Sequence, residues 1–145
     1  MKYDKVKINV PNVTGNIQIV VSAEAYQIDN LSKVSEWVAN HRINSEGSIQ
    51  SSSQAYLSNA IPVQIGDIIR MKNCGTLTNC YASVLVSDSS SIGTSGSITN
   101  FTKEGDIFIF TIAANGYFRA MMLMSELDTD EKRTSVVITK NEPIA

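Results

Sequence analysis

Short segments in which apolar and polar residues alternate run along most of this chain, and they constrain its fold more than any other feature. The stretch KVKINV at residues 5–10 places Val6, Ile8 and Val10 against lysine and asparagine, as in a β-strand, whose successive side chains point to opposite faces. About eight or nine such strands recur at regular spacing without long helical patterns between them, which is typical of a sandwich or barrel. The sequence therefore predicts an all-β fold, an antiparallel β-sandwich.

Turn-forming residues divide these strands and indicate the domain organisation. The turn sequence PNVTGN separates the strands KVKINV and IQIVVSA, so residues 1–24 are expected to form a lead-in β-hairpin. Residues 25–145 are then expected to form the sandwich. A total of 145 residues corresponds to a single domain.

The segments that connect the strands also have predicted conformations. Residues 27–39 leave two alternatives open, a short helical turn or a connector that crosses one end of the sandwich. Trp37 is expected to anchor this connector, and Arg42 to enter a strand that turns at Gly47. The Ser/Gly-rich stretch SDSSSIGTSGS and the charged stretch LDTDEKR are expected to be loops.

Composition bears on several classes of partner. The 12 Lys and Arg residues are scattered and the net charge is -2, so no basic stripe for nucleic acid is expected. No apolar run is long enough for a transmembrane span, and the opening MKYDK is not followed by the apolar core of a signal peptide. The sequence predicts neither nucleic-acid binding nor membrane insertion.

Metal sites, cofactors and disulfides receive little support from the sequence. Cys74 and Cys80 flank the loop GTLTN at a spacing that matches no zinc pattern, and two reduced thiols are the favoured interpretation. The stretch DTDE at residues 128–131 lacks the spaced ligands and glycine of a calcium loop. We expect no metal and no cofactor.

Enzyme motifs are likewise missing from the sequence. No phosphate-binding glycine loop or nucleophile elbow is present, and His41 stands alone. Asp67 and Asp106 each follow a glycine and precede an apolar strand, so turn formation explains them better than catalysis. Glu104 and Glu126 fit surface positions. The sequence predicts a protein that is not an enzyme.

A binding surface is the functional alternative that the residues leave open. Trp37, Tyr56, Tyr81 and Tyr117 could stack on sugar rings, while arginine and asparagine side chains could bind sugar hydroxyls. Aromatic residues in short strands are also common in cores, with one polar tip in water. The candidate binding residues chosen from this set, which also included Arg70, are Trp37, Arg42, Tyr56, Asn59, Tyr117 and Arg119.

The stretches WVANHRINSEGSIQ and YLSNAIPVQIGDIIRMKN carry a resemblance to a known family. They resemble a domain of tail, baseplate and fibre proteins from phages and prophages of Gram-positive bacteria. The closing SVVITKNEPI is similar to the end of that domain, and the first two strands are similar to the pair that leads into it. The matching residues are Trp37, Arg42, Ile43, Ser45, Gly47, Asn59, Ile61, Pro62, Val63, Gly66, Asp67, Ile69, Arg70 and Lys72.

The resemblance implies a jelly-roll-like sandwich similar to carbohydrate-binding modules. It implies a virion structural protein, made in the host cytoplasm, that assists attachment to a cell-wall or capsular carbohydrate. Other virion proteins would be partners, and a homotrimer would suit a fibre. The alternative is a purely structural spacer, cap or decoration module. Whether the chain is a whole protein or one domain of a longer protein stays open.

Overall fold

The computed structural model describes residues 36–75 and 80–144, which form an antiparallel β-sandwich, so the all-β prediction is confirmed. The hairpin predicted over residues 1–24 lies outside the described residues. Within the described ranges, no helix is long and apolar enough to cross a membrane. The described elements are β1 (Trp37–Ile43), β2 (Ile49–Ser58), β3 (Ile61–Val63), β4 (Ile68–Lys72), β5 (Tyr81–Leu85), β6 (Gly96–Thr99), β7 (Phe101–Glu104), β8 (Ile107–Thr111), β9 (Gly116–Leu123), α1 (Asp130–Ser135) and β10 (Val137–Lys140).

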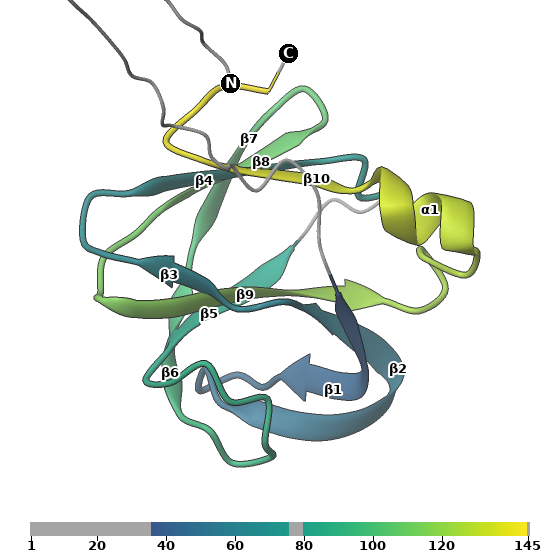
Figure 1. Cartoon of the computed structure of the whole chain (residues 1–145), viewed down its shortest axis with the longest axis horizontal. Helices are drawn as coiled ribbons and strands as arrows, with labels where there is room; N and C mark the ends of the chain where they lie inside the picture. The colour runs from purple at the N-terminus through teal and green to yellow at the C-terminus, as the bar shows by residue number, and fades with distance from the viewer. Residues whose placement is uncertain (1–35, 76–79, 145) are drawn as a thin grey trace, which may run out of the picture. The chain divides into compact units, whose positions relative to one another are not determined.

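Two sheets form the layers of the sandwich (Figure 1). The first has the strand order β1-β2-β9-β5-β6, with β3 also paired to β9, and the second has the order β10-β4-β8-β7. Strands β6 and β7 lie at the ends of their sheets, and Asn100 alone separates them along the chain. The chain therefore passes from one sheet to the other at Asn100.

Large apolar side chains fill the space between the two sheets. Phe110 of β8 packs edge-to-face on Phe118 of β9, with ring centroids 5.1 Å apart, and both are fully buried. Phe101 of β7 packs in the same way on Phe108 of β8, also at 5.1 Å. Each of the three fully buried rings, Phe108, Phe110 and Phe118, contributes about 1.5–3 kcal/mol to folding. This aromatic core accounts for the alternating burial along β8.

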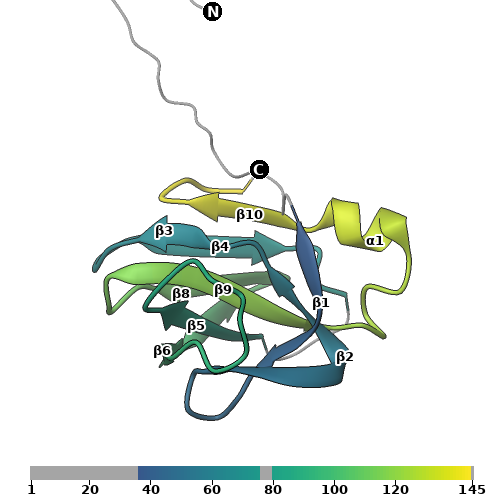
Figure 2. The same ribbon diagram turned by 60° about the horizontal axis from the view of Figure 1, so that its bottom comes forward.

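The first sheet curls strongly, so that the β1–β2 hairpin packs against its own inner face (Figure 2). The turn end of this hairpin contacts the loop before β6. There the Ile49 amide donates to the Thr94 carbonyl at 2.9 Å, and the Gly93 amide donates to the Ile49 carbonyl at 2.8 Å. A second apolar cluster fills the curl. Its buried members are Ile43, Ile49, Leu57 and Leu85, with Val38 and Met121 packed beside them.

The turn between β1 and β2 confirms the turn predicted at Gly47. Gly47 has a φ of 90°, and a Cβ atom there would lie 2.8 Å from the carbonyl oxygen of Gly96. The Asn44 side-chain oxygen accepts hydrogen bonds from the amides of Glu46 and Ser48, at 2.9 and 3.0 Å. Glycine is thus required both for the backbone conformation and for the close approach to β6.

Two segments differ from the sequence predictions. Of the segment 27–39, residues 27–35 lie outside the described residues. Residues 37–39 belong to β1 and form neither a helical turn nor a connector, because Val38 pairs with Leu57 of β2. Residues 130–135 form helix α1 where a charged loop was predicted. The Thr129 side chain caps this helix by accepting a hydrogen bond from the third helical amide at 3.2 Å, which satisfies a donor that the helix itself leaves open.

Candidate functional site

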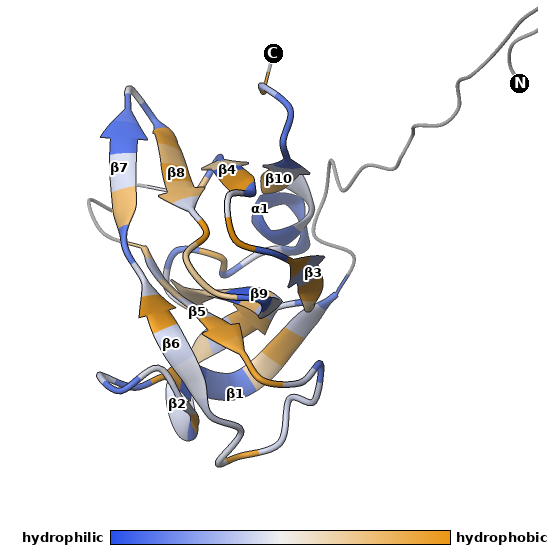
Figure 3. Ribbon diagram, turned by 90° about the vertical axis from the view of Figure 1, so that its left-hand side faces the viewer, coloured by the Kyte–Doolittle hydropathy of each residue, from blue (hydrophilic) through white to orange (hydrophobic). Residues whose placement is uncertain are grey.

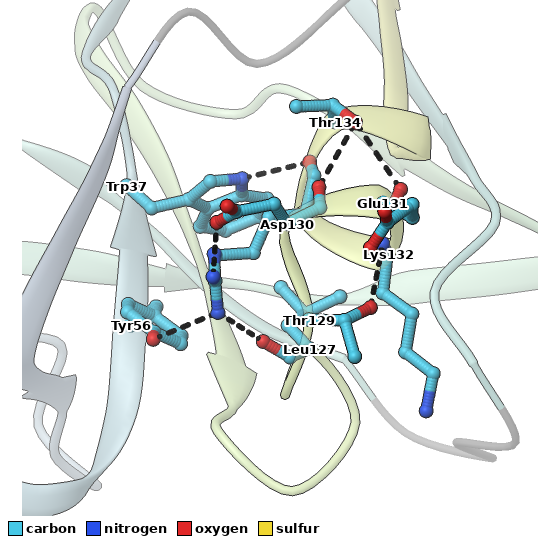
Figure 4. Close-up of polar contacts among 9 residues, drawn as sticks. Trp37, Tyr56, Leu127, Thr129, Asp130, Glu131, Lys132 and Thr134 are labelled. Carbon is cyan, nitrogen blue, oxygen red and sulfur yellow. Dashed lines mark hydrogen bonds and ion pairs between the residues drawn. The ribbon is translucent and has the colours of Figure 1, made fainter.

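Trp37 and Tyr56 pack against helix α1 and form, with Arg133, a cluster that we call the aromatic clamp (Figure 4). The two rings meet edge-to-face at 6.2 Å, and the Trp37 indole donates to the Arg133 carbonyl at 3.0 Å. The Arg133 guanidinium donates to the Tyr56 hydroxyl at 3.2 Å and to the Leu127 carbonyl at 2.7 Å, and it pairs with Asp130. The polar atoms of both aromatic residues are therefore engaged within the fold.

Arg119 is buried inside the curl of the first sheet. It is one of five buried polar or charged residues in the described part of the chain, and only 5% of it is exposed. It donates to the carbonyl oxygens of Ser58 at 2.7 Å and Asp88 at 2.8 Å, while its Nε atom has no hydrogen-bond partner. Burial lowers the pKa of Arg119, and the negative charges of Glu36 and Asp88 partly oppose this shift. These contacts tie the end of β2 to the loop after β5.

The remaining candidates lie apart from one another. Tyr117 of β9 is half-buried, paired with Pro62 of β3 and with Leu85 of β5. Asn59 is half-buried in the link between β2 and β3. Arg70, which belonged to the wider set of polar candidates, donates to the Glu142 carbonyl at 3.1 Å. Of the six chosen residues, Arg42 is the one that lines a groove with an exposed aromatic ring.

That groove opens at the mouth of the curl and has a volume of about 430 Å³; we call it the Tyr81 groove. Tyr81 is 54% exposed and Ile98 is 39% exposed, although both are large apolar side chains. Tyr81 pairs with Met121 of β9, so their side chains share one face of the sheet. The lining residues are Arg42, Ile43, Asn44, Ser45, Tyr81, Ile98 and Met121.

The polar side of the Tyr81 groove comes from the β1–β2 turn. Arg42 donates from Nη2 to the Gln50 side-chain oxygen at 2.9 Å, which holds the guanidinium at the rim. Within the lining set Arg42 is the sole charged residue, and Asn44 and Ser45 add an amide and a hydroxyl. The groove thus joins an aromatic face and an apolar floor to several hydrogen-bond donors. The sequence analysis named Tyr81 among the aromatic residues that could stack on sugars, but did not include it in the six candidate binding residues.

Asp67 has the turn-forming role that the sequence predicts. Its two carboxylate oxygens accept hydrogen bonds from the Gln64 amide at 2.9 Å and from the Asn141 side chain at 3.0 Å. Burial acts to raise the pKa of Asp67, but these two hydrogen bonds and the charge of Lys140 lower it below its usual value. The carboxylate is therefore held ionised as part of the β3–β4 turn.

The other acidic candidates lie away from the Tyr81 groove. Asp106 forms the β7–β8 turn with Gly105, whose φ is 61°. Asp106 and Glu126 line a separate cavity of about 570 Å³, which Lys132 also lines. Glu104 ends β7 as an exposed residue. In the part of the chain that the structure describes, no three His, Cys, Asp or Glu residues gather as a metal site.

The cysteines are buried free thiols in the structure. Burial raises the pKa of the Cys74 thiol to about 12. Burial also raises the pKa of Cys80, and the neighbouring Cys74 adds to that shift. Both side chains therefore stay protonated and behave as small apolar residues.

Comparison of the chain with protein-family models, with curated proteins and with solved structures gave no match.

Proposed function

We propose that this chain is a non-enzymatic, carbohydrate-binding β-sandwich that helps a phage particle attach to the surface of its host. The observation that carries the binding part is the Tyr81 groove, where an exposed aromatic ring, an apolar floor and polar side chains meet at one opening. Small-molecule sites are typically apolar pockets of about 300–1,000 Å³ with a few placed polar groups. The groove, at about 430 Å³, fits that description.

Each side chain of the groove has its own role in the proposed complex. The exposed face of Tyr81 stacks on the apolar face of a sugar ring. Arg42, held by Gln50, directs its remaining N–H groups toward sugar hydroxyls or toward an acidic substituent. The Asn44 carbonyl oxygen is engaged in the turn, so its NH₂ group is the part that can donate to the sugar.

The virion setting rests on the sequence resemblance, as do the jelly-roll connectivity, the homotrimer and the contacts with other virion proteins. A shallow groove binds a single glycan weakly. Repeated copies on one particle would raise the overall affinity by about 10²–10⁴-fold without any new contact. Attachment would therefore come from many weak sites acting together.

The test is binding of the full chain to an array of neutral and acidic oligosaccharides, followed by calorimetry on the glycans that bind. Tyr81→Ala is expected to lower affinity by about tenfold or more, because the stacking face is lost. Ile92→Ala removes another exposed apolar side chain, outside the groove, and should leave binding unchanged. A blank array, or equal binding by Tyr81→Ala, would contradict the proposal.

Arg42 and Trp37 provide a second comparison, with purified host cell walls as the ligand. Arg42→Ala is expected to reduce binding at unchanged stability, since Arg42 lines the groove. Trp37→Ala is expected to reduce stability at unchanged binding per folded molecule, since its indole is bonded to Arg133. If both variants lose stability without a selective loss of binding, both residues are architectural.

A structural spacer, cap or decoration module is the second candidate. It is favoured by exposed apolar side chains on two connecting segments, Ile65 after β3 and Val86 and Ile92 after β5. Such side chains would suit contacts with other virion proteins. A blank array together with association between this chain and another virion protein would favour this candidate.

A further inference from the structure

A further cavity, of about 350 Å³, lies beside β6 and β7. Figure 3 shows these two strands following one another along one side of the sandwich. We call this hollow the β6–β7 cavity. Side chains from β6, β7 and β8 line it together with residues of the β8–β9 link. The residues that matter here are Ser97, Asn100, Phe101, Thr102, Ile109 and Thr111.

This cavity and the Tyr81 groove lie on opposite faces of β6. Ile98 pairs with Ser83, whose hydroxyl donates to the Gly47 carbonyl at 2.7 Å on the groove side. Ser97 pairs with Val84, a buried residue that lines the β6–β7 cavity. Successive side chains of a strand point to opposite faces, and Ile98 borders both hollows. Only the width of β6 separates them.

Strand β6 ends its sheet, so its outer edge is the boundary between the two hollows. Among the described strands, β5 is its one pairing partner. An edge strand presents backbone N–H and C=O groups outward. A chain-like ligand that leaves the Tyr81 groove over this edge would enter the β6–β7 cavity.

The chemistry of the β6–β7 cavity differs from that of the groove. Its lining contains no charged residue, but it carries the hydroxyls of Ser97, Thr102 and Thr111 and the amide of Asn100. The side chains of Asn100, Thr102 and Thr111 make no hydrogen bond within residues 36–75 and 80–144. Hydroxyls both donate and accept, and an amide does the same. This set complements the hydroxyls of an uncharged sugar, with Phe101 and Ile109 as the apolar wall.

We propose that the β6–β7 cavity is a second subsite, which takes an uncharged sugar unit of the same oligosaccharide whose other end occupies the Tyr81 groove. The inference rests on the proposed glycan-binding function and adds to it that the ligand is an extended chain. Joining two weak contacts in one ligand makes the second contact intramolecular, so affinity rises steeply once the chain spans both.

The experiment compares chain lengths by calorimetry on the full chain. The probes are the disaccharide and the hexasaccharide of β-linked N-acetylglucosamine, which is uncharged, and of hyaluronan, which bears carboxylates. The variants are the double replacement Thr102→Val with Thr111→Val, and Tyr81→Ala. Valine keeps the shape of threonine and suits strands, and both threonines are exposed, so the fold should persist. Ser53→Ala, an exposed hydroxyl of β2 outside both hollows, is the matched control.

For at least one probe series, the hexasaccharide is expected to bind about tenfold or more tightly than the disaccharide. The double valine variant should lose about tenfold for the hexasaccharide and nothing for the disaccharide, whereas Tyr81→Ala should weaken both. The control should match the wild type. The second subsite is overturned if the two chain lengths bind with equal affinity, or if the double valine variant binds as the wild type does. In either case the proposed function still stands as long as binding depends on Tyr81. Failure of all four probes overturns the inference. The proposed function is overturned only if the array is also blank, or if Tyr81→Ala binds its glycans as tightly as the wild type.

Discussion

Arg42 and Arg119 carry the same side chain but have opposite relations to solvent. Arg42 reaches the rim of the Tyr81 groove, with the neutral Gln50 oxygen as its partner. Arg119 is buried and is held by two neutral carbonyls. A buried charge is costly unless its hydrogen bonds are made, so Arg119 belongs to the architecture and Arg42 to the surface chemistry. Sequence placed both among the binding candidates, because a strand arginine carries no local sign of its burial.

Replacement of Arg119 by methionine should destabilise the protein by about 1–3 kcal/mol, since it leaves the Ser58 carbonyl without its donor at a fully buried residue. The free energy of unfolding from urea titration is the measurement. Arg119→Lys keeps the charge but loses the planar guanidinium. Its free energy of unfolding should lie between those of the wild type and Arg119→Met. Glycan binding by the folded Arg119→Met protein should be unchanged; unchanged stability with lost binding would instead make Arg119 a ligand contact.

At the scale of elements, the aromatic clamp holds helix α1 against the sheet, and the N-cap residue stabilises the first turn of the helix. Thr129 accepts from the third helical amide, and Arg133 in the last turn contacts Tyr56. Trp37, the single tryptophan of the chain, donates to the helix backbone at 3.0 Å. The indole therefore reports directly on whether α1 is docked.

Replacement of Thr129 by alanine should cost about 1 kcal/mol of stability, because a capping oxygen is lost. The same change should alter the fluorescence of Trp37, since a frayed helix exposes the indole to water. Thr102→Ala, an exposed strand threonine, is the control for losing a hydroxyl and should leave the emission unchanged. An unaltered emission in Thr129→Ala would mean that α1 stays docked without its cap.

The secondary-structure elements also show which features of the fold the sequence predicts and which it does not. Alternation predicts strands such as β4 and β8 because one face of each meets the core. Glycine and aspartate predict the turns at Gly47 and Asp67, because those conformations are set locally. Long-range pairing leaves no comparable signal: the Arg133–Tyr56 contact joins residues 77 positions apart.

The candidate site was harder to predict for the same reason. The Tyr81 groove takes its walls from three separate parts of the chain, the β1–β2 turn, the β5–β6 pair and β9. They meet only because the first sheet curls, and alternation along one strand does not encode curling of the sheet. Arg42 could be named in advance as a polar candidate, but its proximity to Tyr81 could not.

At the scale of the whole molecule, Asp67 links three regions of the fold. It lies before β4, accepts from the amide of Gln64 after β3, and accepts from Asn141 after β10. Its pKa is lower in the folded protein than in an unfolded chain. The stability that it contributes is therefore fully present above its unfolded pKa of about 3.9 and is lost as pH falls through the folded value.

Asp67→Asn should consequently lower stability at pH 7 and flatten the loss of stability below about pH 4. Urea titrations at pH 7 and at pH 3 measure both effects. Glu104→Gln removes an exposed carboxylate at the end of β7 and serves as the control, with stability changed little at either pH. If the stability of Asp67→Asn falls with pH as steeply as that of the wild type, the acid sensitivity comes from other groups.

The serine-rich segment after β5 is fixed at both sides of its tip. The Val86 amide donates to the Ser95 carbonyl at 3.0 Å, and Gly93 is bonded to Ile49 of β2. Extra residues inserted between Ser89 and Ser90 would lie between these anchors, and each doubling of loop length costs only about 0.6 kcal/mol of closure entropy. The same loop that closes the curl is thus a grafting position, where a peptide epitope or a dye could be displayed on the folded domain.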